Sequence, residues 1–172
     1  MSGRCLILLC EDSREDVFLV RNAFAKAGFS HVIVEARNGQ QAVNYLSGSG
    51  LYADRRKHPL PDLVLLDLRM PLMDGFEVLA WLKTRGDLGW LPVVVLSASD
   101  LPADQERARK LGADDYLVKP SEWKDLVQVV QDLHDKWITK ATRSRSLRAK
   151  LHSLKPAVHS KQSGVERPRP RV

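Results

Sequence analysis

Five polar side chains follow directly on runs of apolar residues, and their types suit phosphoryl chemistry. In chain order they are Glu11, Asp12, Asp67, Ser97 and Lys119. Carboxylate oxygens are the ligands that Mg²⁺ prefers, and phosphate oxygens commonly complete its coordination shell. A nearby hydroxyl and ammonium group could donate to the other phosphoryl oxygens, and such charge neutralisation does much of the work of phosphoryl transfer. An aspartate in such a site can itself be the nucleophile and form an acyl phosphate.

The pattern of apolar runs indicates how the chain brings these groups together. Runs of strand length stand at 5–10, 31–36, 62–67, 92–97 and 115–119. Their cores are continuously hydrophobic, as expected for strands covered on both faces of a parallel sheet. Segments with helical spacing lie between and after them, at about 13–27, 39–46, 102–111 and 121–139, with one more from 75 onward.

Strict alternation of five strands with five helices predicts an α/β fold with a doubly wound five-stranded parallel sheet. Such a sheet binds its ligand at the carboxyl ends of its strands. Any one of these acids alone would more often be a solvated turn residue. All five polar residues, however, follow predicted strands in this way, which favours a single site at that edge of the sheet.

Charge divides the chain into two parts. The 172 residues are 44% hydrophobic, enough for a sizeable core, and carry a formal net charge of +6. From Lys140 onward ten basic residues accompany one acid, Glu166, whereas the preceding part has 17 basic and 20 acidic residues. We therefore expect a folded, mildly acidic domain at 1–140 and a basic, largely disordered tail at 141–172. Three leucines at helical spacing in the tail allow a short extension of the last helix.

The cysteines and the lack of long apolar segments bear on location. As parts of one strand, Cys5 and Cys10 would lie on opposite faces and roughly 16 Å apart, too far for a disulfide. Buried free thiols suit a reducing cytosol. The sequence shows neither a signal peptide nor an apolar stretch of the roughly 20 residues that a membrane span needs. These features predict a cytoplasmic protein without a membrane span.

Four segments of the sequence resemble the response regulator receiver family of two-component signalling. They are CEDS at 10–13, LLDLRMPLMDG at 65–75, VVLSAS at 94–99 and GADDYLVKP at 112–120, within a resemblance that spans about residues 4–139. The acidic first turn, a long loop around 47–61 and Trp137 in the last helix most resemble single-domain regulators associated with phytochromes. The resemblance implies a flavodoxin-like fold of five βα units.

The same resemblance implies roles for the acidic residues. Asp67 would be the phosphoacceptor, and Glu11 and Asp12 would be the acidic pair that binds Mg²⁺. Asp12 would be a direct metal ligand and Glu11 would act through water. Asp67 itself and the backbone carbonyl of Arg69 would complete the ligands from the protein.

Three further positions match residues that respond to phosphorylation in this family. Ser97 would be the hydroxyl drawn to the phosphoryl group, Lys119 the ammonium that pairs with it, and Tyr116 an aromatic rotamer switch. Tyr116 could instead be only a core aromatic residue. The family also implies a cis peptide bond between Lys119 and Pro120, an isomer that is accessible mainly before proline.

Arg69 and Ser99 occupy positions that flank the path of the hydrolytic water in receivers. We hypothesise that Arg69 lies over the phosphoryl group and changes its rate of hydrolysis. Other charged residues are interpreted as ordinary: Asp16, Asp114 and Asp115 as surface or turn charges, and all five histidines as solvated. Trp137 is interpreted as a packing residue that could alternatively belong to a dimer face.

The predicted function is that of a single-domain response regulator rather than an enzyme. A sensor histidine kinase, of the phytochrome type by resemblance, or a phosphotransfer protein would donate a phosphoryl group to Asp67 with Mg²⁺ bound. Output would follow by protein contact, by onward phosphorelay, or by a homodimer through the fourth helix, fifth strand and fifth helix.

Two other functions remain as alternatives. A phosphohydrolase with an aspartate nucleophile would need a second aspartate at the position of Arg69, which disfavours it. A receiver-regulated protein could bind nucleic acid through its basic tail, because clustered Lys and Arg attract phosphates. The tail could also be an inert extension.

Overall fold

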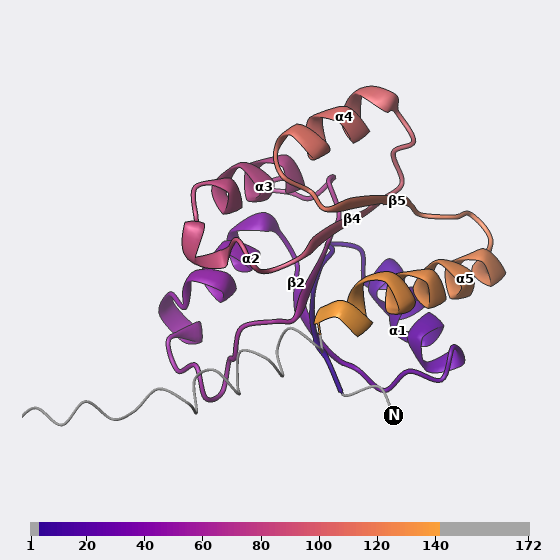
Figure 1. Ribbon diagram of the computed structural model, residues 1–172, viewed down its shortest axis with the longest axis horizontal. Helices are drawn as coiled ribbons and strands as arrows, with labels where there is room; N and C mark the ends of the chain where they lie inside the picture. The colour runs from indigo at the N-terminus through magenta and orange to yellow at the C-terminus, as the bar shows by residue number, and fades with distance from the viewer. Residues whose placement is uncertain (1–3, 142–172) are drawn as a thin grey trace, which may run out of the picture.

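The computed structural model describes residues 4–141, in which five strands alternate with five α-helices (Figure 1). The strands are β1 (Leu6–Cys10), β2 (Val32–Ala36), β3 (Leu63–Leu66), β4 (Val93–Ser97) and β5 (Asp115–Val118). The helices are α1 (Arg14–Lys26), α2 (Gly39–Ser47), α3 (Gly75–Lys83), α4 (Pro102–Lys110) and α5 (Trp123–Leu133). The predicted last helix is continued by a π-helical turn, His134–Ile138. The predicted basic tail lies, apart from Ala141, outside the described residues.

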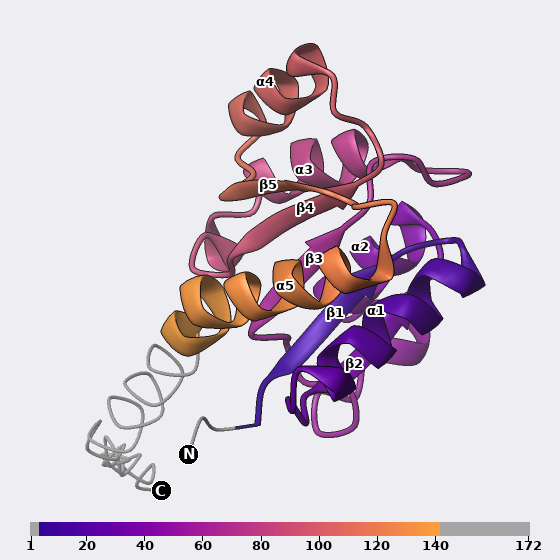
Figure 2. The ribbon, with the colours of Figure 1, turned by 90° about the vertical axis from the view of Figure 1, so that its right-hand side faces the viewer.

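All strand pairings in the sheet are parallel, and the strand order is β2-β1-β3-β4-β5. Helices α1 and α5 cover one face, and α2, α3 and α4 cover the other (Figure 2). This arrangement confirms the predicted doubly wound α/β fold. The order reverses between β1 and β3, so the crevice of such a fold opens at their carboxyl ends. No helix within residues 4–141 is long and apolar enough to cross a membrane.

The central strands are buried on both faces, which explains their continuously apolar sequences. Every residue of β3 and β4 is buried, whereas the edge strands β2 and β5 are only partly covered. Cys10 packs in the layer of α2 and α3, and Cys5 packs in the layer of α1 and α5. Both are buried free thiols on opposite faces of the sheet, as predicted.

The turn from β3 into α3 is built to approach the strand end closely. Asp74 and Glu77 form a capping box, in which each side chain accepts the other residue's backbone N–H at 2.8 Å. A Cβ atom on Gly75 would lie 2.3 Å from the backbone oxygen of Asp67. Glycine is therefore required at this contact, and α3 begins at Gly75, where the sequence predicted a helical segment.

The long loop between α2 and β3 is fixed by Arg55. The guanidinium of Arg55 donates to the backbone oxygens of Tyr45 at 2.7 Å and Leu46 at 2.6 Å, in the last turn of α2. Helix C-termini leave such carbonyl oxygens without partners, and a basic side chain can satisfy them. The loop leads into the start of β3 at Leu63, so it lies at the end of the sheet where the strand begins, away from Asp67.

The histidines among the described residues are packed rather than solvated, which corrects the interpretation from sequence. The rings of His31 and His134 stack with centroids 5.4 Å apart, and Phe29 stacks on His134 at 3.7 Å. His58 packs edge-on against Tyr52. Burial lowers the pKa of His31, and neighbouring His134 adds to this. The stack joins the α1–β2 turn to the end of α5, segments far apart in the sequence, so no local pattern indicates it.

Candidate functional site

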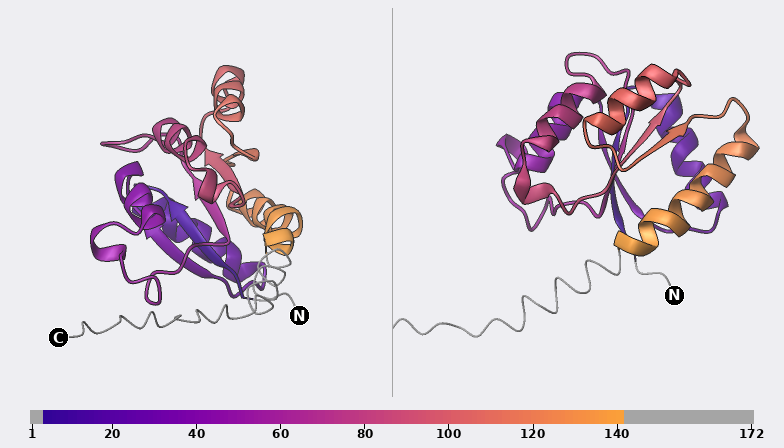
Figure 3. Two further views of the ribbon diagram at one scale, coloured as in Figure 1. Left: turned by 60° about the vertical axis from the view of Figure 1, so that its left-hand side comes forward. Right: turned by 45° about the horizontal axis from the view of Figure 1, so that its top comes forward.

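Parallel strand pairing brings the predicted site residues to one edge of the sheet, with helices on both sides of it (Figure 3). Glu11 and Asp12 directly follow β1, Asp67 follows β3, Ser97 ends β4, and Lys119 follows β5. The contacts among them determine what chemistry this edge can support.

Glu11, Asp12 and Asp67 form a cluster of carboxylates. One oxygen atom from each lies within 4.8 Å of the others. Glu11 and Asp67 are only 2% and 6% exposed, whereas Asp12 is open to solvent. Hard oxygen ligands with one side open to water suit a divalent cation that keeps several of its waters. The residues present therefore fit a divalent metal ion.

Lys119 supplies the positive charge at the centre of this cluster. Its Nζ atom lies 2.5 Å from Glu11 Oε2, 2.7 Å from Asp16 Oδ2 and 3.6 Å from Asp67 Oδ2. The Lys119 side chain is 14% exposed, so water screens these interactions only in part. The ammonium therefore contacts three carboxylates at once.

Asp16 is a site residue that the sequence interpretation missed, because it was interpreted as an ordinary surface charge. Its carboxylate lies in the first turn of α1, where Ser13 accepts the Asp16 backbone N–H at 3.2 Å and caps the helix. Its position four residues after Asp12 did not indicate that its carboxylate reaches Lys119.

The Asp67 carboxylate is held in place by its own loop. Asp67 Oδ1 accepts the backbone N–H of Leu68 at 2.8 Å, and Oδ2 faces Lys119. The close approach of Gly75 to the Asp67 carbonyl fixes the backbone from the other side. One carboxylate oxygen is thus oriented toward the ammonium while the other is anchored.

Burial and charge shift the titration of Glu11 and Lys119. Burial raises the pKa of Glu11 above its usual value, although its contact with Lys119 opposes the rise. Burial by itself would lower the pKa of Lys119, but the hydrogen bonds to Asp16 and Glu11 outweigh it and the pKa is raised. Lys119 is therefore a permanent cation at neutral pH.

Ser97 and Tyr116 lie on neighbouring strands beside this cluster. Ser97 is fully buried, and Tyr116 is half-buried. The Tyr116 hydroxyl donates to the backbone oxygen of Ser99 at 2.8 Å, in the loop between β4 and α4. Tyr116 also packs against the core formed with α2 and α3. The structure thus connects Tyr116 to the loop that follows Ser97, and its switching role stays a prediction.

The Arg69 side chain lies on Asp104. Arg69 Nη2 is 2.9 Å from Asp104 Oδ2, and the same oxygen accepts the Ser99 hydroxyl at 2.6 Å. To lie over a phosphoryl group on Asp67, as hypothesised from the sequence, Arg69 would have to leave this carboxylate. The role of the Arg69 backbone carbonyl as a metal ligand stays a prediction.

The peptide bond between Lys119 and Pro120 is trans, and every other described peptide bond is trans as well. The expectation of a cis peptide bond between Lys119 and Pro120 is therefore wrong. A trans bond is the intrinsically favoured isomer even before proline, by about 0.5–1 kcal/mol. The contacts of the Lys119 ammonium described above are made with this trans bond.

Asp115 is not an ordinary surface charge, which corrects the interpretation from sequence, whereas Asp114 is exposed in the bend before β5 as expected and also accepts a backbone hydrogen bond. Asp114 Oδ2 accepts the backbone N–H of Val93 at 2.8 Å, at the start of β4. Asp115 Oδ2 accepts from Trp137 Nε1 at 2.9 Å and from Lys136 Nζ at 2.7 Å. Both aspartates therefore have structural roles, and Trp137 is confirmed as a packing residue that ties the π-helical turn after α5 to β5.

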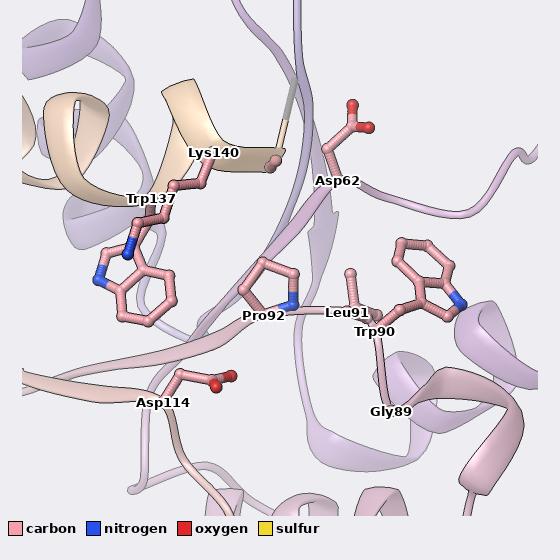
Figure 4. A pocket seen from close by; sticks show the side chains of 9 residues that line it. Asp62, Gly89, Trp90, Leu91, Pro92, Asp114, Trp137 and Lys140 are labelled. Carbon is pink, nitrogen blue, oxygen red and sulfur yellow. The ribbon is translucent and has the colours of Figure 1, made fainter. Parts of the chain in front are cut away.

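A separate hollow of about 200 Å³ lies at the start of β4 (Figure 4). Trp90 and Trp137 stand on opposite sides of it, with Pro92 between them. Its lining includes none of the five predicted site residues. It belongs to the edge of the sheet opposite the carboxylate cluster, so it does not extend the candidate site.

Comparison with known proteins gives a consistent result. The response regulator receiver domain family matches residues 7–131. The response regulator Rcp1 of Synechocystis sp. is 37% identical over 137 residues, which cover 80% of this chain and 91% of Rcp1. The probable methanogenesis regulatory protein FilR2 of Methanothrix harundinacea is 38% identical over 136 residues, 77% of this chain and 83% of FilR2.

Solved structures agree with the sequence relatives. The phosphorylated cyanobacterial phytochrome response regulator RcpA is similar with a TM-score of 0.74 and 36% identity, over 80% of this chain and 96% of RcpA. The Mn²⁺-bound form of Rcp1 is similar with a TM-score of 0.70 and 37% identity, over 78% and 94% of the two chains. Together with the fold and the carboxylate cluster, these matches show that the chain belongs to the response regulator receiver family.

Proposed function

We propose that the chain is a single-domain response regulator that accepts a phosphoryl group on Asp67. The observation that carries this proposal is the convergence of Lys119 with Glu11, Asp12 and Asp67 at the strand ends. The buried Asp67 carboxylate is oriented by Leu68 N–H and faces a permanent cation. This is the environment that an attacking carboxylate and a developing phosphoryl charge require.

The donor would be a phosphohistidine on a sensor histidine kinase or on a phosphotransfer protein. A carboxylate oxygen of Asp67 attacks phosphorus, the bond between phosphorus and the imidazole nitrogen breaks, and the released imidazole takes up a proton. Lys119 neutralises charge on the phosphoryl oxygens during the transfer. Phytochrome response regulators among the similar structures support a phytochrome-type kinase as the partner.

Mg²⁺ is the proposed cofactor of this transfer. Asp12 and Asp67 would bind it directly, Glu11 would act through water, and the Arg69 carbonyl would complete the protein ligands. When bound, the ion supplies charge neutralisation and orients the phosphoryl oxygens. The carboxylate cluster supports this assignment, because its ligands are hard oxygen atoms.

The output would arise from Ser97, Tyr116 and Lys119. Ser97 ends β4 and Tyr116 reaches the loop that follows it, so a movement of Ser97 toward the phosphoryl group would be felt at Tyr116. That change would alter the face of α4, β5 and α5 for a protein partner, a second copy of the chain, or onward phosphorelay. A phosphohydrolase is disfavoured because Arg69 occupies the place of the second aspartate.

Incubation with acetyl phosphate and Mg²⁺, followed by intact mass measurement, tests the proposal. Wild-type protein should gain the mass of one phosphoryl group, and Asp67→Asn should gain none. Chelation of the metal should suppress the gain. Equal gains in mass for the two proteins, with or without the metal, would rule out Asp67 as the acceptor.

A further inference from the structure

One oxygen of Asp104 is shared by side chains from two other segments. Asp104 Oδ2 accepts hydrogen bonds from Arg69 Nη2 at 2.9 Å and from Ser99 Oγ at 2.6 Å. The Asp104 side chain is 15% exposed, whereas that of Arg69 is 65% exposed. The carboxylate is thus held by the fold, while the guanidinium reaches it from the solvent side.

These contacts join the phosphoacceptor loop to the first turn of α4. Arg69 stands two residues after Asp67, and Asp104 lies in the first turn of α4. Arg69 is thus tied to Asp67 by two residues of backbone and to Asp104 by its side chain. A change of partner from Asp104 to a group on Asp67 would therefore need only a movement of that long side chain.

Asp104 does not depend on Arg69 alone. The hydrogen bond from Ser99 holds the pKa of the Asp104 carboxyl below its usual value, and the charge of Arg69 contributes further. Asp104 would keep the Ser99 hydroxyl as a partner if Arg69 left. The position of Asp104 in the first turn of α4 also favours its negative charge, because helix N-termini carry partial positive charge.

Phosphorylation of Asp67 would set up a competition for the Arg69 guanidinium. A phosphoryl group carries about −1.5 to −2 charges and three strong acceptor oxygens. A planar guanidinium matches such oxygens with two parallel hydrogen bonds, which are stronger than a single bond to one carboxylate oxygen. The exposed Arg69–Asp104 pair is screened by water and holds its cation weakly.

We propose that Arg69 exchanges partners, pairing with Asp104 when Asp67 is unmodified and with the phosphoryl oxygens when Asp67 is phosphorylated. Asp104 and Ser99 are then positioning residues that hold Arg69 away from the acceptor, and the exchange removes a cation from the first turn of α4. This inference rests on the proposed phosphorylation of Asp67.

The exchange predicts how two single variants act on the lifetime of the phosphoryl group. In hydrolysis, water attacks phosphorus, the bond to the Asp67 oxygen breaks, and inorganic phosphate leaves. Arg69→Gln removes the guanidinium that pairs with the phosphoryl group. Asp104→Asn removes the competing carboxylate, so Arg69 should pair with the phosphoryl group for a larger fraction of the time. The two variants should therefore shift the half-life several-fold in opposite directions, and Asp104→Asn should have no effect once Arg69 is Gln.

The experiment phosphorylates each protein with acetyl phosphate and Mg²⁺, removes the donor, and follows the loss of the phosphoryl mass with time. Glu106→Gln is the matched control on α4, since it removes an exposed pair with Arg109 and should leave the half-life unchanged. Thermal unfolding verifies that each variant is folded.

The outcomes separate this inference from the proposed function. No phosphoryl mass on the wild type would reject the proposed function itself. If the wild type is phosphorylated but Arg69→Gln and Asp104→Asn change the half-life in the same direction, the exchange is overturned. A contact with only a structural role would give the same effect whichever of its two partners is replaced. An Asp104→Asn effect that persists in the Arg69→Gln background would overturn it as well.

Discussion

At the scale of single residues, Lys119 determines how three neighbouring carboxylates can coexist in a partly buried site. Its ammonium contacts Glu11 and Asp16 directly and faces Asp67 at 3.6 Å. Carboxylates this close repel one another unless a cation stands between them. A divalent ion would serve the same purpose at Glu11, Asp12 and Asp67, and the lysine and such an ion would then neutralise the carboxylates together.

Lys119→Gln should therefore lower stability and make it more dependent on metal. We expect the free energy of unfolding without Mg²⁺ to fall by roughly 2–4 kcal/mol, because the buried carboxylate of Glu11 loses its charged partner. Added Mg²⁺ should raise the stability of the variant more than that of the wild type, since binding to the folded state stabilises it. Urea unfolding with and without the metal measures both effects.

Lys136→Gln is the matched control for this prediction. Lys136 also pairs with an aspartate, Asp115, but its side chain is 57% exposed. Loss of this ion pair should lower the free energy of unfolding by about 0–1 kcal/mol. It should leave the response of stability to Mg²⁺ unchanged. A Lys119→Gln protein as stable as the wild type, with the same metal response, would show that Lys119 does not neutralise the cluster.

At the scale of elements, the β3–α3 turn sets the geometry of Asp67, the proposed phosphoacceptor. Asp67 is the first residue beyond β3, and α3 begins at Gly75. The backbone of Gly75 lies against the backbone of Asp67, and the Asp74–Glu77 capping box fixes the start of the helix there. The acceptor is thus positioned by a helix that follows it in the chain as well as by the strand before it.

Gly75→Ala should disturb both folding and phosphorylation. The new Cβ would lie 2.3 Å from the Asp67 oxygen and 2.8 Å from the Leu68 Cα, both backbone atoms. Such overpacking typically costs about 1–3 kcal/mol, and here the relief must come from movement of the acceptor loop. We expect a lower free energy of unfolding together with slower gain of the phosphoryl mass from acetyl phosphate.

Gly86→Ala provides the comparison, because a Cβ there would meet nothing within 4 Å. It should leave stability nearly unchanged and phosphorylation unaffected. If Gly75→Ala behaved like Gly86→Ala in both measurements, the close contact would not position Asp67.

At the scale of the whole molecule, the order of strands and helices follows from the sequence because each element carries a local signal. Continuous apolar runs such as 62–67 predict buried parallel strands, and glycines such as Gly28 and Gly112 mark helix ends with positive φ. The rule that parallel strands present chemistry at their carboxyl ends then places Asp67 and Lys119 together.

No local pattern in the sequence indicates the polar contacts between distant segments. Asp16 reaches Lys119, and Asp104 binds Arg69, because of the rotation of α1 and α4 about their own axes on the sheet. The apolar pattern of a helix indicates its buried face but not which distant group a polar side chain contacts, and α4 has a single fully buried residue, Ala108. Asp16 and Asp104 therefore needed the structure, whereas Asp67 and Lys119 did not.

The basic segment after the folded domain provides the last test. Ala141 is buried against the layer of α1 and α5, so a truncation should retain it and remove residues 142–172. The sheet and the helices described in the structure lie within residues 4–141, so the truncated chain should still gain a phosphoryl group on Asp67. If the segment binds nucleic acid, the full chain should bind duplex DNA with an affinity that falls steeply with salt. The logarithm of the binding constant should fall with the logarithm of the salt concentration, with a slope of about −0.9 per phosphate neutralised. The truncated chain should not bind. Titration of a labelled duplex at several salt concentrations measures this, and equal weak binding by both chains would leave protein contact or phosphorelay as the output.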